Sequence, residues 1–139
     1  MSILHEVFDT EESRLNFILG CIRVSKCNDR FHEKERNFIM KSSLALGLNE
    51  KSGERIDKAM LNEFERMDLV FSTKKQKILF IKEMIDLCYY DGHYDSVEKE
   101  EISIISKSLN ILESTVTEIE QWILSGIEWN KKGEKILNA

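Results

Sequence analysis

The chain repeats one apolar pattern at an offset of 63 residues. Within each half, apolar residues recur every three or four positions, which is the period of an amphipathic helix. The pattern predicts two similar units, each made of a helix, an acidic turn, a second helix, an apolar stop and a third helix. Two such units would bury their apolar stripes against each other in one compact all-α domain. The matched pairs are Ile18 and Ile81, Ile22 and Ile85, Val24 and Leu87, Phe31 and Tyr94, Glu35 and Glu98, Ile39 and Ile102, Leu46 and Leu109, and Leu48 and Ile111.

The first unit, residues 10–67, predicts three helices. The first begins at Asp9, where Glu12 would complete a capping box. The second begins at about Glu33 and stops at Gly47, because glycine suits the left-handed conformation that ends many helices. Asn49 is expected to cap the third. The residues expected on buried faces are Leu15, Ile18, Leu19, Ile22 and Ser25, then Phe38, Ile39, Ser42 and Leu46, then Ile56, Ala59, Met60, Phe64 and Met67.

The second unit, residues 73–127, predicts three more helices. Thr73 with Gln76 is expected to cap the first of them, Asp95 or Ser96 the next, and Ser114 the last. The structure of the tail, residues 128–139, stays open. The expected core faces are Ile78, Ile81, Met84, Ile85 and Cys88, then Ile102, Ile105 and Leu109, then Val116, Ile119, Trp122, Ile123 and Ile127.

Composition supports a helical fold and excludes several classes of function. The chain has 139 residues, no proline and 6 glycines, so it lacks the residues that punctuate β-sandwiches and long ordered loops. Its length suits a single domain spanning residues 1–139. The formal charge of −5 argues against a nucleic-acid partner, whose phosphates need a basic surface. No serine or cysteine lies beside a base in a known motif, and we expect no enzymatic activity.

The cysteines and the apolar runs predict a cytoplasmic protein. Cys21, Cys27 and Cys88 form no C-x-x-C pair and lie among apolar residues, which is typical of buried free thiols. The first residues lack the basic start and apolar core of a signal peptide. The apolar runs are also too short for a membrane span.

The acidic turn between the first two helices of each unit is the candidate site. In the second unit it carries Asp91, Asp95 and Glu98, and in the first it carries Asp29 and Glu35. Both copies keep a glutamate at the same place, and the two turns would converge if the units pack about a pseudo-dyad. Such oxygen clusters suit Ca²⁺, Mg²⁺ or Mn²⁺.

The same residues also have purely structural interpretations. Acids in the first turn of a helix are favoured by the macrodipole and by capping, without any ligand. Zinc would require His93 or His32 of the two turns to join the ligands, although histidines in turns are commonly ordinary exposed residues.

The second turn resembles the signature of a known family. The string Asp91-Gly92-x-Tyr94-x-x-x-Glu98, followed by Ile102, Ile105, Leu109 and Ile111, is similar to the motif of the TerB-like family. That family is named for tellurite resistance, and a related domain sits at the front of a membrane-anchored DnaJ-type co-chaperone. The resemblance covers about residues 15–127.

The resemblance implies two inverted three-helix repeats, a role in stress response, and an acidic patch that binds a divalent metal or partner proteins. Carried over to this chain, the patch comprises Asp91 and Glu98 of the second motif and Glu35 of the first. Asn28 stands where the first motif has an aspartate, with Asp29 adjacent.

Two hypotheses about function follow. In the first, a non-enzymatic TerB-like module binds a divalent cation or a protein partner through the acids of the two turns. We call these residues the acidic corner: Asp29, Glu35, Asp91, Asp95 and Glu98. In the second, the acids serve only as helix caps, and an apolar surface binds a protein partner. Trp129, just past the last expected helix, is the candidate anchor for a partner or for self-association into a homo-oligomer.

Overall fold

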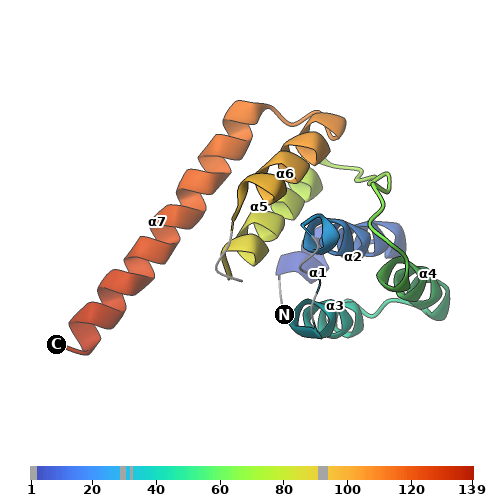
Figure 1. Ribbon diagram of the computed structural model, residues 1–139, viewed down its shortest axis with the longest axis horizontal. Helices are drawn as coiled ribbons and strands as arrows, with labels where there is room; N and C mark the ends of the chain where they lie inside the picture. The colour runs from blue at the N-terminus through green and yellow to red at the C-terminus, as the bar shows by residue number, and fades with distance from the viewer. Residues whose placement is uncertain (1–2, 29–30, 32, 91–93) are drawn as a thin grey trace.

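The computed structural model describes residues 3–28, 31, 33–90 and 94–139, and within them every regular element is an α-helix (Figure 1). None of the helices in these ranges is long and apolar enough to cross a membrane. The helices are α1 (Ile3–Val7), α2 (Glu11–Lys26), α3 (Glu33–Ala45), α4 (Glu50–Leu61), α5 (Lys74–Tyr90), α6 (Ser96–Ser108) and α7 (Glu113–Leu137).

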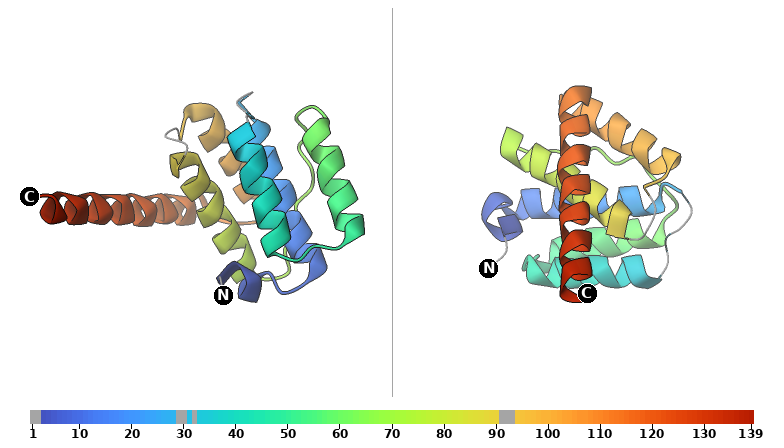
Figure 2. Two further views of the ribbon diagram at one scale, coloured as in Figure 1. Left: turned by 90° about the horizontal axis from the view of Figure 1, so that it is seen from below. Right: turned by 90° about the vertical axis from the view of Figure 1, so that its left-hand side faces the viewer.

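The helix boundaries follow the offset of the sequence pattern. Helices α2, α3 and α4 begin at residues 11, 33 and 50, and α5, α6 and α7 begin at 74, 96 and 113, each 63 residues later. Helix α2 packs against α3 and α4, while α5 packs against α6 and α7. Helix α2 also contacts α5 and α6, so the two sets of three share one core (Figures 1 and 2).

The second helix of each set ends in the same way. Gly47 and Asn110, again 63 residues apart, both adopt a positive φ, of 65° and 59°. The next residue donates its backbone N–H to the carbonyl five residues earlier, Leu48 to Ser43 and Ile111 to Ser106. This is a Schellman ending, which requires a left-handed residue that glycine or asparagine supplies.

Several predicted caps are confirmed. Asn49 accepts a hydrogen bond from Ser52 N at 2.9 Å, and Asp95, rather than Ser96, caps α6. Thr73 accepts from Gln76 N at 3.1 Å, although the Gln76 side chain bonds to Ser72 N.

Two predicted caps are wrong. Helix α2 is capped by Thr10, whose hydroxyl forms a capping box with Ser13, so the box begins one residue after Asp9. Helix α7 begins at Glu113 after Leu112, which makes no side-chain cap, instead of at Ser114.

Helix α4 is shorter than predicted, and Phe64 and Met67 lie beyond it. The Lys26 ammonium donates to the carbonyls of Ala59, Met60 and Asn62, which satisfies the free carbonyls where α4 ends at Leu61. Met67 is nevertheless buried, whereas Phe64 is exposed. Phe38, predicted to face inward from α3, is also 42% exposed.

Residues 62–73 connect the two sets of helices without regular structure. Side chains of α2 hold this connector: Arg23 Nη1 donates to the carbonyl of Met67 at 2.9 Å, and Asn16 Oδ1 accepts from Val70 N at 2.8 Å. The connector has no helix or strand in which to pair its backbone groups, and these two bonds satisfy one of its carbonyls and one of its amides.

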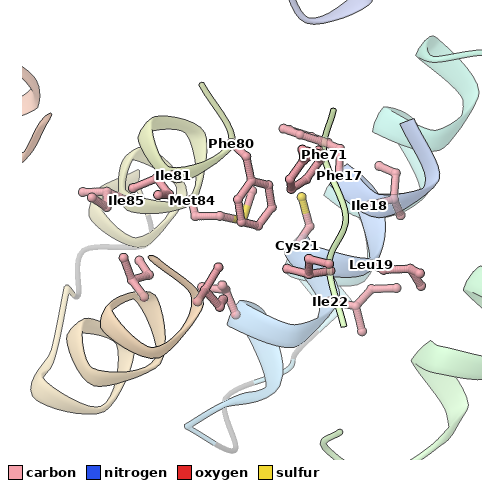
Figure 3. Packing of buried hydrophobic residues seen from close by; sticks show 14 of the residues in the cluster. Phe17, Ile18, Leu19, Cys21, Ile22, Phe71, Phe80, Ile81, Met84 and Ile85 are labelled. Carbon is pink, nitrogen blue, oxygen red and sulfur yellow. The ribbon is translucent and has the colours of Figure 1, made fainter. Parts of the chain in front are cut away.

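Helices α2 and α5 meet through a group of aromatic rings. Phe80 of α5 lies with its ring centroid 6.0 Å from that of Phe17 and 5.0 Å from that of Phe71 (Figure 3). A Cβ added at Gly20 of α2 would overlap the Phe80 ring, so the glycine permits this close approach. Phe8, just past the unpredicted helix α1, completes the group and is fully buried.

Helix α7 continues through residues 128–137, whose structure the sequence left open. Its C-terminal half projects away from the other helices (Figures 1 and 2). Val116, Ile119 and Ile123 face the core as predicted, but Trp122 is 60% exposed and is not a core residue.

Candidate functional site

The two acidic turns meet in the structure. Asn28, in the turn after α2, donates through Nδ2 to Oδ2 of Asp95 at 3.2 Å. These residues lie 67 positions apart in the sequence, and both are half-buried. The two turns are therefore in contact at Asn28 and Asp95, while the expected grouping of Asp91, Glu98 and Glu35 stays a prediction because Asp91 falls outside the described residues.

Asp95 and Glu98 both cap helix α6. Asp95 Oδ1 accepts from Glu98 N at 2.8 Å, and Glu98 Oε1 accepts from Asp95 N at 3.1 Å, which is a reciprocal capping box. Glu98 is 7% exposed. The capping bond engages Oδ1 of Asp95, and the bond from Asn28 engages Oδ2. Asp95 and Glu98 therefore have a structural role in the turn.

The other predicted ligands are Glu35 and four residues that the structure does not describe. Glu35 lies half-buried in the first turn of α3. Asp91, Asp29, His93 and His32 fall outside the described residues. In the part of the chain that the structure describes, no three His, Cys, Asp or Glu side chains are grouped as a metal site.

The carboxylates around the two turns contribute to the pKa of the nearby Cys27 thiol. Burial raises the pKa of the half-buried Cys27 thiol to about 12, and the carboxylates of Glu98, Glu101 and Asp95 add to the increase. A thiolate there would be repelled by negative charge contributed from α6 and its cap. The thiol therefore stays protonated at neutral pH, which is the opposite of an activated nucleophile.

A buried ion pair next to this corner is absent from the sequence-based predictions. Glu101 of α6 binds Arg23 Nε of α2 at 2.6 Å and Arg66 Nε of the connector at 3.1 Å. The Glu101 side chain is 3% exposed. The available signal is a break in the repeat: 63 residues before Glu101 stands the apolar Phe38, so this helix position carries unlike residues in the two units.

Helix α7 carries the second candidate site, an exposed apolar stripe. Trp122, Trp129 and Ile136 follow one another at seven-residue intervals and are 60%, 76% and 65% exposed. We call this set, with the intervening Gly126 and Gly133, the α7 stripe. Seven residues make nearly two helical turns, so the stripe occupies one side of the helix.

The α7 stripe begins beside an acidic groove between α3 and α5. Lys82 of α5 lies with its ammonium 5.5 Å from the centroid of the Trp122 ring and binds Asp86 at 3.1 Å. Burial raises the pKa of the neighbouring Glu83. The groove, of about 340 Å³, is lined by Phe38, Glu83, Asp86, Leu87 and Tyr90.

The chain was compared with models of protein families, with curated proteins and with solved structures, and it matches none of them.

Proposed function

We propose that this chain is a non-enzymatic helical interaction module of the TerB-like kind, which binds a protein partner through the α7 stripe. The observation that carries the proposal is the exposure of Trp122, Trp129 and Ile136 on a helix that extends beyond the body of the molecule. In this proposal Asp95 and Glu98 act as helix caps.

The chemistry of the α7 stripe favours a protein partner. Tryptophan is enriched among residues that dominate binding energy at interfaces, since its large ring buries much apolar area with few rotatable bonds. Single exposed apolar residues are ordinary, but Trp122, Trp129 and Ile136 lie on one side of the same helix and concentrate exposed apolar area there.

The TerB-like assignment is supported by the recurrence of helix starts and Schellman endings at an offset of 63 residues. Two similar helix–turn–helix–helix units are what that resemblance implies. The acidic turn lies at the junction of the first two helices in each unit.

A comparison of two double variants tests the proposed function. Trp122→Ala with Trp129→Ala should abolish capture of the partner from an extract of the source cells, while the helical content by circular dichroism stays unchanged. Asp95→Ala with Glu98→Ala should lower the melting temperature and retain the same partner. Loss of the partner only in the acidic double variant would refute the assignment of the surface.

A second candidate function is cation binding at the acidic corner. It is favoured by the placement of Asp95 and Glu98 near Cys27, where their carboxylates add to the burial that raises the pKa of the thiol. Asp91, Asp29 and Glu35 would complete the oxygen ligands for Ca²⁺, Mg²⁺ or Mn²⁺, and His93 or His32 those for Zn²⁺.

Calorimetry with each ion tests the second candidate. Heat of binding that disappears in Asp91→Ala with Glu98→Ala, but persists in the surface control Glu128→Ala, supports a cation site. No heat and no thermal shift at millimolar metal eliminates it.

A further inference from the structure

We propose that the partner of the α7 stripe is a second copy of this chain, and that two α7 helices pair antiparallel to form a symmetric dimer. This inference rests on the proposed function and names the occupant of the same surface. It is carried by the register of large and small residues along α7, by the lack of an internal reason for its glycines, and by the distribution of charge.

The α7 stripe has the spacing of a coiled-coil seam. Trp122, Gly126, Trp129, Gly133 and Ile136 are separated by four, three, four and three residues. Such spacing keeps one side of a helix against a neighbouring helix. Here the seam alternates a large ring with a residue that has no side chain.

An antiparallel pair matches the large residues to the small ones. If Trp129 lies opposite Gly126 of the second copy, the same register places Trp122 opposite Gly133, because each pair of positions adds to 255. Each tryptophan then packs as a knob over a glycine. A parallel pair in register would instead put tryptophan against tryptophan and glycine against glycine, which leaves both a clash and a void.

Packing within the single chain does not require glycine at residues 126 and 133. A Cβ at Gly126 or Gly133 would meet nothing within 4 Å, and neither residue has a positive φ. Glycine inside a helix lowers its stability relative to alanine. Close approach of a second helix supplies the reason for glycine that the isolated chain lacks.

Charge along α7 favours the antiparallel direction. Residues 113–127 carry Glu113, Glu118 and Glu120 and no basic residue, whereas residues 128–137 carry Lys131, Lys132 and Lys135 against two glutamates. An antiparallel pair places each acidic half beside the basic half of the other copy.

The geometry allows the pairing to close at two copies. The C-terminal half of α7 projects from the body, so the second molecule has access to it without displacing another helix (Figure 2). Because each copy contributes the same surface, the interface is isologous and leaves no free surface for further growth. Four tryptophan rings of about 200 Å² each set its central area, below that of a standard interface, which predicts reversible association.

Sedimentation velocity of the full chain over a range of concentrations tests the proposal. The wild-type chain should pass from monomer to dimer as concentration rises. Gly126→Leu should raise the dissociation constant at least tenfold while the monomer keeps its helical content, because the added side chain has open space in the monomer but fills the position of the opposing Trp129. Leu124→Ala, on the other side of α7, is the matched control and should leave the constant unchanged within twofold.

Cross-linking tests the direction of the helices. In a Cys27→Ser background, a short bismaleimide should link two copies of Ser125→Cys, whose positions lie about 8 Å apart along the axis of the proposed pair. Two copies of Asn138→Cys would lie about 30 Å apart and should not be linked. Linking at Asn138→Cys, or equal dissociation constants for Gly126→Leu and wild type, overturns the antiparallel register.

The outcomes separate this inference from the proposed function. A chain that stays monomeric at all concentrations, with partner capture still lost in the tryptophan double variant, refutes the dimer and retains the proposed function. Monomeric behaviour with partner capture unaffected refutes both. A chain that stays monomeric but binds vesicles of anionic lipid through Trp122 and Trp129 also overturns the dimer, since a membrane surface would then be the occupant.

Discussion

The buried pair of Arg23 and Glu101 offers a direct measure of how the two sets of helices are held together. The change Glu101→Leu removes the carboxylate 2.6 Å from Arg23 Nε and leaves the guanidinium buried, with its hydrogen bond to Met67 O. Deleting one partner of a buried ion pair costs about 3–5 kcal/mol. This is a large share of the roughly 5–15 kcal/mol that stabilises a typical domain.

The reciprocal change should cost less. Arg23→Met leaves Glu101 with Arg66 as a partner at 3.1 Å, and Arg66 can follow it because its own side chain is 56% exposed. We expect a loss of about 2–3 kcal/mol, near the lower limit of the combined cost of a lost hydrogen bond to a charged group and an unpaired Met67 carbonyl, because Arg66 keeps Glu101 paired.

The double variant distinguishes ion pairing from general disruption. Arg23→Met with Glu101→Leu replaces two buried charges by apolar side chains, so its cost should fall to about 1–2 kcal/mol. The two single costs would then exceed that of the double variant by at least about 3 kcal/mol, which is a coupling free energy between contacting residues.

Urea denaturation followed by circular dichroism gives these free energies. With a slope of about 2 kcal/mol per molar urea, the loss expected for Glu101→Leu moves the midpoint by roughly 2 M. Single costs that simply add in the double variant, or a loss below about 1 kcal/mol for Glu101→Leu, would refute the reasoning.

Three further predictions concern stability. Gly20→Ala should destabilise the protein by about 1–3 kcal/mol in thermal or urea unfolding, since the new methyl group overlaps the Phe80 ring. Gly53→Ala, where a Cβ meets open space, is the control. Equal stability of the two variants would contradict the close packing of α2 and α5. Asp95→Ala should cost about 1–2 kcal/mol through the lost cap of α6, and Asp95→Asn should restore much of it, whereas equal losses in both would point to charge instead of capping. Because the pKa of Cys27 is raised to about 12, its protonated form stabilises the fold up to about pH 9, and that contribution is lost as pH rises from there towards 12. Cys27→Ser should therefore show a smaller loss of stability over this range, and an unchanged alkaline profile would rule the thiol out.

Local signals in the sequence were sufficient for most of the helices. The turns marked by Gly47, Asn49 and Asp95 depend on the conformations and side-chain oxygens of single residues, which a sequence displays directly. The Asp9 prediction was wrong by one residue because Thr10 and Ser13 offer an equivalent box, and local propensity does not choose between neighbouring caps.

Contacts between distant residues explain the remaining errors. Helix α4 ends at Leu61 with Asn62 as its C-cap, and Lys26, 33–36 residues away, binds its last carbonyls, whereas the apolar period continues to Phe64 and Met67 and does not mark that end. Trp122 shares the helical period of Ile119 and Ile123, yet it lies at the edge of the face that α5 and α6 cover. A contact between the two turns, seen at Asn28 and Asp95, was predictable from the repeat, but the Arg23–Glu101 pair was not, because it breaks that repeat.

The connector at residues 62–73 has a consequence for how two copies of the chain can associate. Proteins built from two similar units are prone to exchange them, with one half of each molecule completing the other after the link between halves straightens. Straightening this connector would break two hydrogen bonds that it accepts or donates, one between Arg23 and the Met67 carbonyl and one between Asn16 and the Val70 amide. These two hydrogen bonds between the connector and α2 therefore oppose the exchange of halves. We expect two copies to associate instead through surfaces that the folded monomer already presents.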